Sequence, residues 1–77
     1  MIKVSSPKIL NNVIGKEVTL RKINSYVSNG TYYACFLDNN MIGMCSPDTI
    51  FRSDEIKGNI VSSEVIYGNT RLFLEVK

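Results

Sequence analysis

The side chains of this chain that could do chemistry are two cysteines and a few carboxylates, because the sequence contains no histidine. The chain therefore lacks the usual general base, the usual activator of a nucleophile and the commonest metal ligand. Cys35 and Cys45 cannot supply the four ligands of a structural zinc site by themselves, and no glycine-rich phosphate-binding motif is present. We therefore expect a protein that is not an enzyme and that holds no metal and no cofactor.

The thiols and the loop acids have plainer structural interpretations. Cys35 and Cys45 lie in apolar segments without a neighbouring cation, which favours buried thiols over a disulfide or a catalytic cysteine. Asp54-Glu55 follow Ser53, as acids at the start of a helix do, although adjacent acids could also form a catalytic pair. Asp38-Asn39-Asn40 is typical of a turn, since a calcium loop needs several spaced acids and a terminal glutamate.

Aromatic side chains are numerous for a chain without tryptophan, and they could form a recognition surface. Tyrosine beside arginine or lysine on a barrel face can grip single-stranded nucleic acid by stacking and phosphate contacts. Tyr32 and Tyr33 cannot both take part, because successive side chains of a strand point to opposite faces. A nucleic-acid or nucleotide binder, in the form of a sequestering oligomer, is therefore one hypothesis. Its binding residues would be Arg21, Lys22, Tyr32, Arg52 and Arg71.

Composition indicates one small folded domain. The 77 residues are 44% hydrophobic and 21% charged, and the net charge of +2 is too small to indicate a nucleic-acid partner by itself. We expect a single β domain over residues 1–77, with an N-terminal arm or short helix over 1–15 and a β core over 16–77. No apolar stretch could span a bilayer and no secretory signal is visible, which predicts a cytoplasmic protein without a membrane partner. The frequent Asn and Ile fit a low-GC genome, such as that of a Gram-positive bacterium or its phages.

Apolar alternation and turn residues predict mainly short strands. The expected strands cover residues 16–23, 31–37, 41–45 and 49–52, and a hairpin closes the chain over 60–77. Val18 and Leu20 should point inward from the first of these strands, while the second is apolar enough to be buried on both faces.

Two segments have the residue order of short helical turns. Ser6, Pro7 and Gly15 match an N-cap, a first helical residue and a left-handed stop, so residues 6–15 could form a two-turn helix or merely a turn. Residues 54–57 could form a second helical turn after Ser53. Residues 1–4 could add an edge strand.

Together these elements predict a small five-stranded antiparallel barrel or half-barrel with one or two helical turns. In the opening of its first strand at Gly15-Lys16-Glu17-Val18 and in the order of its strands, the chain resembles the SH3-like small barrels in layout. The resemblance implies the layout only, and no binding residue is transferred from it.

The terminal hairpin predicts an apolar patch on its outward face that other residues would have to bury. A turn at Gly68-Asn69 would pair Val65 with Leu72 and would place Arg71 across from Ile66. The inward face would then consist of Val61, Val65, Tyr67, Leu72, Leu74 and Val76. The outward face would carry Ile60, Ile66 and Phe73 among charged residues. The N-terminal helix, a second copy of the chain or a different protein could cover this apolar spot.

The leading functional hypothesis is a non-catalytic module that docks on another protein. The expected partner-binding residues are Ile66, Arg71, Phe73 and Glu75, with Tyr26, Asn29 and Tyr32 as a second patch. By analogy with small phage or mobile-element proteins, such a module could inhibit a host enzyme. A homo-oligomer is also compatible with the uncovered face.

Overall fold

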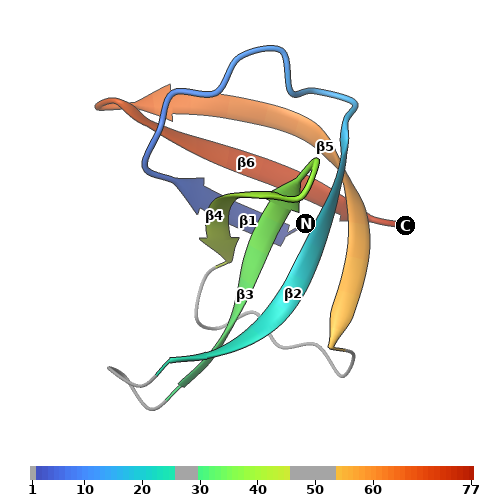
Figure 1. Ribbon diagram of the computed structural model, residues 1–77. Helices are drawn as coiled ribbons and strands as arrows, with labels where there is room; N and C mark the ends of the chain where they lie inside the picture. The colour runs from blue at the N-terminus through green and yellow to red at the C-terminus, as the bar shows by residue number, and fades with distance from the viewer. Residues whose placement is uncertain (1, 26–29, 46–53) are drawn as a thin grey trace.

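The protein is a closed antiparallel β-barrel, and the computed structural model describes residues 2–25, 30–45 and 54–77 of it (Figure 1). The six strands are β1 (Ile2–Ser6), β2 (Glu17–Ser25), β3 (Gly30–Leu37), β4 (Asn40–Cys45), β5 (Glu55–Ile66) and β6 (Asn69–Val76). Around the barrel they follow the order β1-β4-β3-β2-β5-β6. The prediction of a small, mainly β barrel is confirmed.

The barrel has six strands instead of the predicted five, because the N-terminal segment is a full member of its wall. β1 is no edge strand, since it pairs with β6 on one side and with β4 on the other. It joins β6, the last strand of the chain, to β4, the outer strand of the β2–β3–β4 meander, and so closes the sheet on itself (Figure 1). Closure removes most open strand edges, which are otherwise sites of unwanted pairing.

Neither predicted helical turn forms among the described residues. Ser6 is the buried last residue of β1, and residues 7–16 run without a helix. Glu55 to Lys57 belong to β5 and pair with β2. The extended backbone there supplies hydrogen-bond partners to the backbone groups of β2 that β3 does not reach. The predicted strand at 49–52 lies outside the described residues. Within the described ranges, no helix is long and apolar enough to cross a membrane.

The core is formed by the inward side chains of all six strands. As predicted, Val18 and Leu20 point inward, and each is 1% exposed. Tyr33, Ala34 and Cys35 are consecutive buried residues, so the middle of β3 is covered on both faces, as its apolar sequence indicated. The remaining buried apolar residues are Val4, Val13, Cys45, Ile60, Leu72 and Leu74.

The segment between β1 and β2 passes over one end of the barrel, where Figure 1 shows it at the top of the view. Val13 is buried there and Leu10 packs, partly buried, against the core, while Ile9 and Ile14 are exposed, so two apolar side chains and not a helical face cover the end. The buried Thr70 hydroxyl accepts a hydrogen bond from the Leu10 amide at 2.9 Å and donates one to the Lys8 carbonyl at 2.7 Å. This one side chain therefore fastens the crossing segment to β6.

The register of the β5–β6 hairpin differs from the prediction. The turn residues are Tyr67-Gly68, with φ of 51° and 81°, and Ile66 pairs with Asn69. Positive φ at both central residues identifies a type I′ turn. As a result Thr70 pairs with Val65, and Leu72 pairs with Ser63 and not with Val65.

A bulge in β5 then reverses the predicted facing of the residues that precede it, while Val65 stays on the side of the buried Thr70. The register shifts between Ile60 and Ser62, so Val61 is the extra residue and Ile60 turns into the core. Leu72 and Leu74 are buried as predicted. Val65, Tyr67 and Val76 are exposed large apolar residues, which the prediction had placed in the core.

Candidate binding groove

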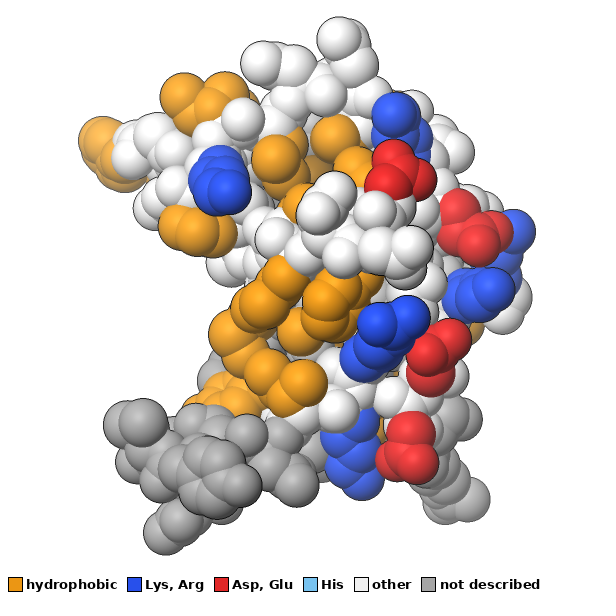
Figure 2. Space-filling model, viewed as in Figure 1, with side chains coloured by type: hydrophobic (Ala, Val, Ile, Leu, Met, Phe, Trp, Pro, Cys, Tyr) orange, Lys and Arg blue, Asp and Glu red, His pale blue; other side chains and the backbone are white. Residues whose placement is uncertain are grey.

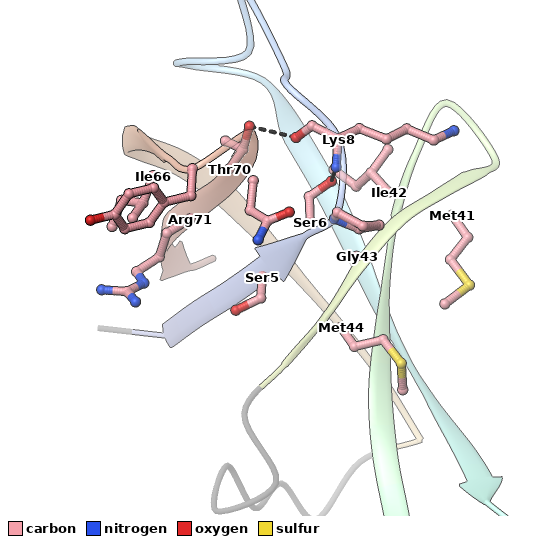
Figure 3. A pocket seen from close by; sticks show the side chains of 13 residues that line it. Ser5, Ser6, Lys8, Met41, Ile42, Gly43, Met44, Ile66, Thr70 and Arg71 are labelled. Carbon is pink, nitrogen blue, oxygen red and sulfur yellow. Dashed lines mark hydrogen bonds between the residues drawn. The ribbon is translucent and has the colours of Figure 1, made fainter.

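An open groove with a volume of about 600 Å³ lies between β4, the end of β1 and the tip of the β5–β6 hairpin. Its size is within the usual range of ligand sites. Its lining residues are Ser5, Ser6, Pro7, Lys8, Met41, Ile42, Gly43, Met44, Ile66, Tyr67, Asn69, Thr70 and Arg71. Figure 3 shows Ile66, Thr70 and Arg71 on one side, the β4 residues on the other, and Ser5 and Ser6 between them.

The groove exists because β1 and β4 separate soon after they meet. They pair only at Val4–Cys45 and Ser5–Met44. Beyond this point β1 continues along β6 as far as the Ser6–Thr70 pair, and Pro7, which has no amide hydrogen to give a sheet, follows. In Figure 2 the molecule is hollowed between the hairpin and β4, with hydrophobic side chains on both sides.

Gly43 permits the close contact at the base of the groove. A Cβ atom at this position would lie 2.3 Å from the Ser5 carbonyl oxygen and 3.1 Å from a Val4 methyl carbon. Backbone cannot retreat as a flexible side chain can, so only glycine allows β1 to approach β4 here. The glycine at position 43 thus determines where β1 and β4 meet and where they begin to separate.

Tyr67 stands at the rim of the groove on unusual backbone. Its side chain is 99% exposed, and its φ of 51° lies in the left-handed region that glycine, asparagine and aspartate prefer. The neighbouring Ile66 is 37% exposed, and Met41 across the groove is 50% exposed. The rim therefore presents three large apolar side chains to solvent.

The electrostatic character of the groove is basic. Lys8 and Arg71 line it, and none of the other described lining residues is charged. Arg71 Nη1 contacts Glu64 Oε1 at 3.3 Å, in a pair whose side chains are both about half exposed. Such exposed pairs contribute little stability, so the guanidinium can exchange this carboxylate for another. Among the described residues Lys8 has no ion-pair partner.

Two of the predicted docking residues line the groove, and two lie elsewhere. Ile66 and Arg71 are at its hairpin side, but Arg71 pairs across the strands with Glu64, so the predicted contact with Ile66 is wrong. Phe73 lies farther along β6 opposite Ser62 and is half-buried, and Glu75 lies opposite Asn59. The predicted single spot of Ile66 and Phe73 is therefore divided.

Of the predicted second patch of Tyr26, Asn29 and Tyr32, only Tyr32 lies among the described residues. Tyr26 and Asn29 lie outside the described residues. Tyr32 is half-buried on β3, where it pairs with Ile23 of β2, and β4 and β1 lie between it and β6 on the groove side of the barrel.

The cations of the nucleic-acid hypothesis are also dispersed. One outward row of cross-strand neighbours runs Glu55, Arg21, Ala34, Met44, Ser5, Arg71 and Glu64. Four strand spacings separate Arg21 from Arg71 in this row, which is about 19 Å along the surface. Lys22, next to Arg21 on its strand, points to the other face, and Arg52 lies outside the described residues.

Arg21 nevertheless lies over an aromatic ring. Its guanidinium carbon lies 5.0 Å from the centroid of the Phe36 ring, and its Nε contacts Glu55 Oε2 at 3.2 Å. Tyr32 shares the outward face of β3 with Phe36, because the two residues are four positions apart on one strand. Arg21 is thus both stacked and paired with a carboxylate.

Most of the apolar wall of the groove is not predicted by the sequence. The sequence predicts a strand without a function for Met41, Ile42 and Met44, and a core position for Tyr67. The signal that could have indicated β4 is its composition, since two methionines and an isoleucine flank a glycine where a strand beside a turn would usually be half polar.

The two cysteines are free and buried, as the sequence predicted. Burial raises the pKa of the Cys35 thiol to about 12, with a further contribution from Cys45, and it raises the pKa of Cys45 to about 11. Protonated thiols of this kind are poor nucleophiles. Over the described part of the chain, no three Cys, Asp or Glu residues come together in a way that could hold a metal ion.

Comparison of the chain with known protein families, curated proteins and solved structures finds no significant match. The groove, its rim and its charges are therefore the features that bear on function.

Proposed function

We propose that this protein is a non-catalytic binding module that docks on another protein through the groove and the hairpin tip beside it. The single observation that carries the proposal is Tyr67, a fully exposed aromatic side chain on left-handed backbone at the groove's rim. A turn of this type is most stable with asparagine or glycine. A tyrosine there adds strain and exposes a ring, which a bound partner would cover.

The composition of the surface supports the same proposal. Tyrosine, methionine and arginine are enriched at the centres of protein interfaces, and the groove offers Tyr67, two methionines and Arg71. The groove is concave, so a partner would bury these side chains more fully than a flat contact would. A module that acts in this way could inhibit an enzyme by occupying its surface.

The test is to use the protein as bait in a lysate of its own host cells and to quantify retained proteins by mass spectrometry. Tyr67→Asn and Met41→Ser should each reduce the specific prey at least tenfold. Val76→Ser is the matched control, because Val76 is as exposed as Met41 (50% each) and lies outside the groove. Circular dichroism would show that all variants are folded.

Two results would contradict the proposal. One is a prey protein that the wild type, Tyr67→Asn, Met41→Ser and the control Val76→Ser all retain equally. The other is a stable dimer in native mass spectrometry that Tyr67→Asn and Met41→Ser dissociate, which would make the groove a self-association surface.

A second candidate function rests on the outward aromatic side chains of β3. Tyr32 and Phe36 share one outward face with Arg21, which is the arrangement that stacks bases and contacts phosphate. A nucleotide that stays bound would raise the absorbance at 260 nm of the purified protein, which has four tyrosines and no tryptophan. Retention that falls steeply with salt and is lost in Arg21→Gln would support this function, and an absorbance spectrum of tyrosine alone would exclude it.

A further inference from the structure

We propose that the groove binds an extended segment of its partner as an added β-strand along β4, with acidic side chains of that segment paired with Lys8 and Arg71. This inference rests on the proposed docking function and adds the conformation and the chemistry of the docked segment. Three observations lead to it: an open strand edge, apolar walls and an uncompensated positive charge.

The open edge is the part of β4 that β1 does not reach. β4 pairs with β3 at Asn40, Met41, Gly43 and Met44, with Ile42 as the extra residue of a bulge, whereas β1 pairs with it only at Met44 and Cys45. Among the described residues, Asn40, Met41 and Ile42 therefore have a neighbouring strand on one side only. Unpaired strand edges are the sites at which extended peptides add to a sheet.

The β3–β4 hairpin determines which backbone groups face the groove. Its two turn residues, Asp38 and Asn39, have φ of 51° and 65°, and Leu37 pairs with Asn40 directly beside them. In a two-residue hairpin this first pair exchanges the hydrogen bonds, so the next residue on each strand turns its amide and carbonyl away. The amide and carbonyl of Met41 therefore point away from β3, toward the side on which the groove lies.

The walls of the groove suit alternate side chains of an extended chain. Met41, Ile42 and Met44 form one wall, and Ile66 with Tyr67 forms the other. A strand laid between them directs one set of side chains into the apolar groove and the other set outward. Methionine adapts its shape to different apolar partners, so the walls do not demand one residue type.

The charges identify the partner as acidic. Lys8 and Arg71 line the groove, and no aspartate or glutamate lies among its described lining residues. A second copy of this chain would bring another Lys8 and Arg71 toward the first pair, which like-charge repulsion opposes. A foreign segment with an Asp or Glu side chain would instead pair with Lys8 and could replace Glu64 as the partner of Arg71.

The experiment uses a phage-displayed library of random linear ten-residue peptides, selected on the full-length protein. Enriched peptides should alternate apolar and polar positions and should contain at least one Asp or Glu. The tightest peptide is then synthesised, and its affinity is measured for the protein and its variants. Lys8→Ala should weaken binding at least tenfold, whereas Lys16→Ala, at an exposed lysine outside the groove, should leave it unchanged.

The added strand is tested separately by removing backbone donors. Met41→Pro deletes the amide that points to the groove, which an edge position tolerates, and it should weaken the peptide at least tenfold relative to Met41→Ser. Methylating the peptide's amides one at a time should abolish binding at alternate positions only, and this readout does not depend on whether the proline variant folds.

Other outcomes overturn the inference. Binding that survives every single N-methylation excludes an added strand, and enriched peptides without acids exclude the charge pairing. A library from which nothing is enriched shows that the groove does not take a linear segment. In that case Tyr67-dependent capture of a folded protein would still support the docking function, so the two failures are distinguishable.

Discussion

Tyr67 is the residue at which local backbone preference and exposed surface conflict most clearly in this protein. Its φ of 51° costs an ordinary L-residue about 1 kcal/mol relative to glycine or asparagine, and its ring is 99% exposed, so packing offsets none of that cost within the chain. Residues held in such regions without a structural reason are frequently functional.

The first prediction is that Tyr67→Asn stabilises the protein. Because asparagine accepts the left-handed conformation, the free energy of unfolding should rise by about 1 kcal/mol, which in a domain of this size corresponds to a Tm increase of about 4–8 °C. Urea denaturation and a thermal melt would measure it. Tyr67→Phe is the control, because it keeps both the ring and the strain and should leave stability unchanged. A destabilised Tyr67→Asn protein would show that the tyrosine contributes to the fold.

Thr70 shows at the scale of an element how a strand holds the segment that crosses the barrel end. Its hydroxyl bridges the Leu10 amide and the Lys8 carbonyl, 60 and 62 positions away in the chain, and the side chain is 1% exposed. This anchoring also fixes Pro7 and Lys8 against the groove, which they line. The barrel-end segment and the groove are thus positioned by the same side chain.

The second prediction follows from that hydroxyl. Thr70→Val keeps the shape of the side chain but leaves the amide of Leu10 and the carbonyl of Lys8 without their partner, which should lower the free energy of unfolding by about 1–3 kcal/mol. Hydrogen exchange of the Leu10 amide should accelerate more than that of the β2 and β3 amides. Thr70→Ser restores the hydroxyl and should recover most of the protection. If the Leu10 amide exchanged in the valine variant at the same rate as in the wild-type protein, the anchoring role of Thr70 would be contradicted.

The β5–β6 hairpin also shows what could be predicted from sequence and what could not. The alternation of Leu72 and Leu74 correctly identified the buried face of β6, since that strand has a regular period of two. The same rule failed on β5, where the bulge at Val61 changes the period and Tyr67 replaces Asn69 in the turn. A bulge costs little locally and is chosen by the fit of the closed barrel, so a single strand's sequence does not reveal it.

The candidate site was less predictable than the strands for a similar reason. Ile66 and Arg71 could be predicted because both lie on one hairpin, whose two faces follow from its alternating sequence. Met41, Ile42, Pro7 and Lys8 join them only because β1 lies between β4 and β6, a pairing between opposite ends of the chain. Such long-range pairings carry no local signal.

At the scale of the whole molecule, the two thiols report on global stability. Cys35 on β3 and Cys45 on β4 are buried in the common core, and their pKa values are raised from 9.0 to about 12 and about 11. In the unfolded chain both thiols would ionise near their ordinary pKa. The stabilisation due to their protonated, buried form is therefore complete below about pH 9 and is lost as the pH rises through 11 and 12.

The third prediction is the resulting alkaline sensitivity. Between about pH 9 and 11 the unfolded state releases thiol protons that the folded state keeps, so the free energy of unfolding should fall by up to about 1.4 kcal/mol per pH unit for each thiol. Urea denaturation at several pH values would measure the slope. The double variant Cys35→Ala, Cys45→Ala is the control, since tyrosine and lysine titration affects both proteins alike. A wild-type slope no steeper than that of the control would show that the folded barrel lets its thiols ionise, and that its core is open to water.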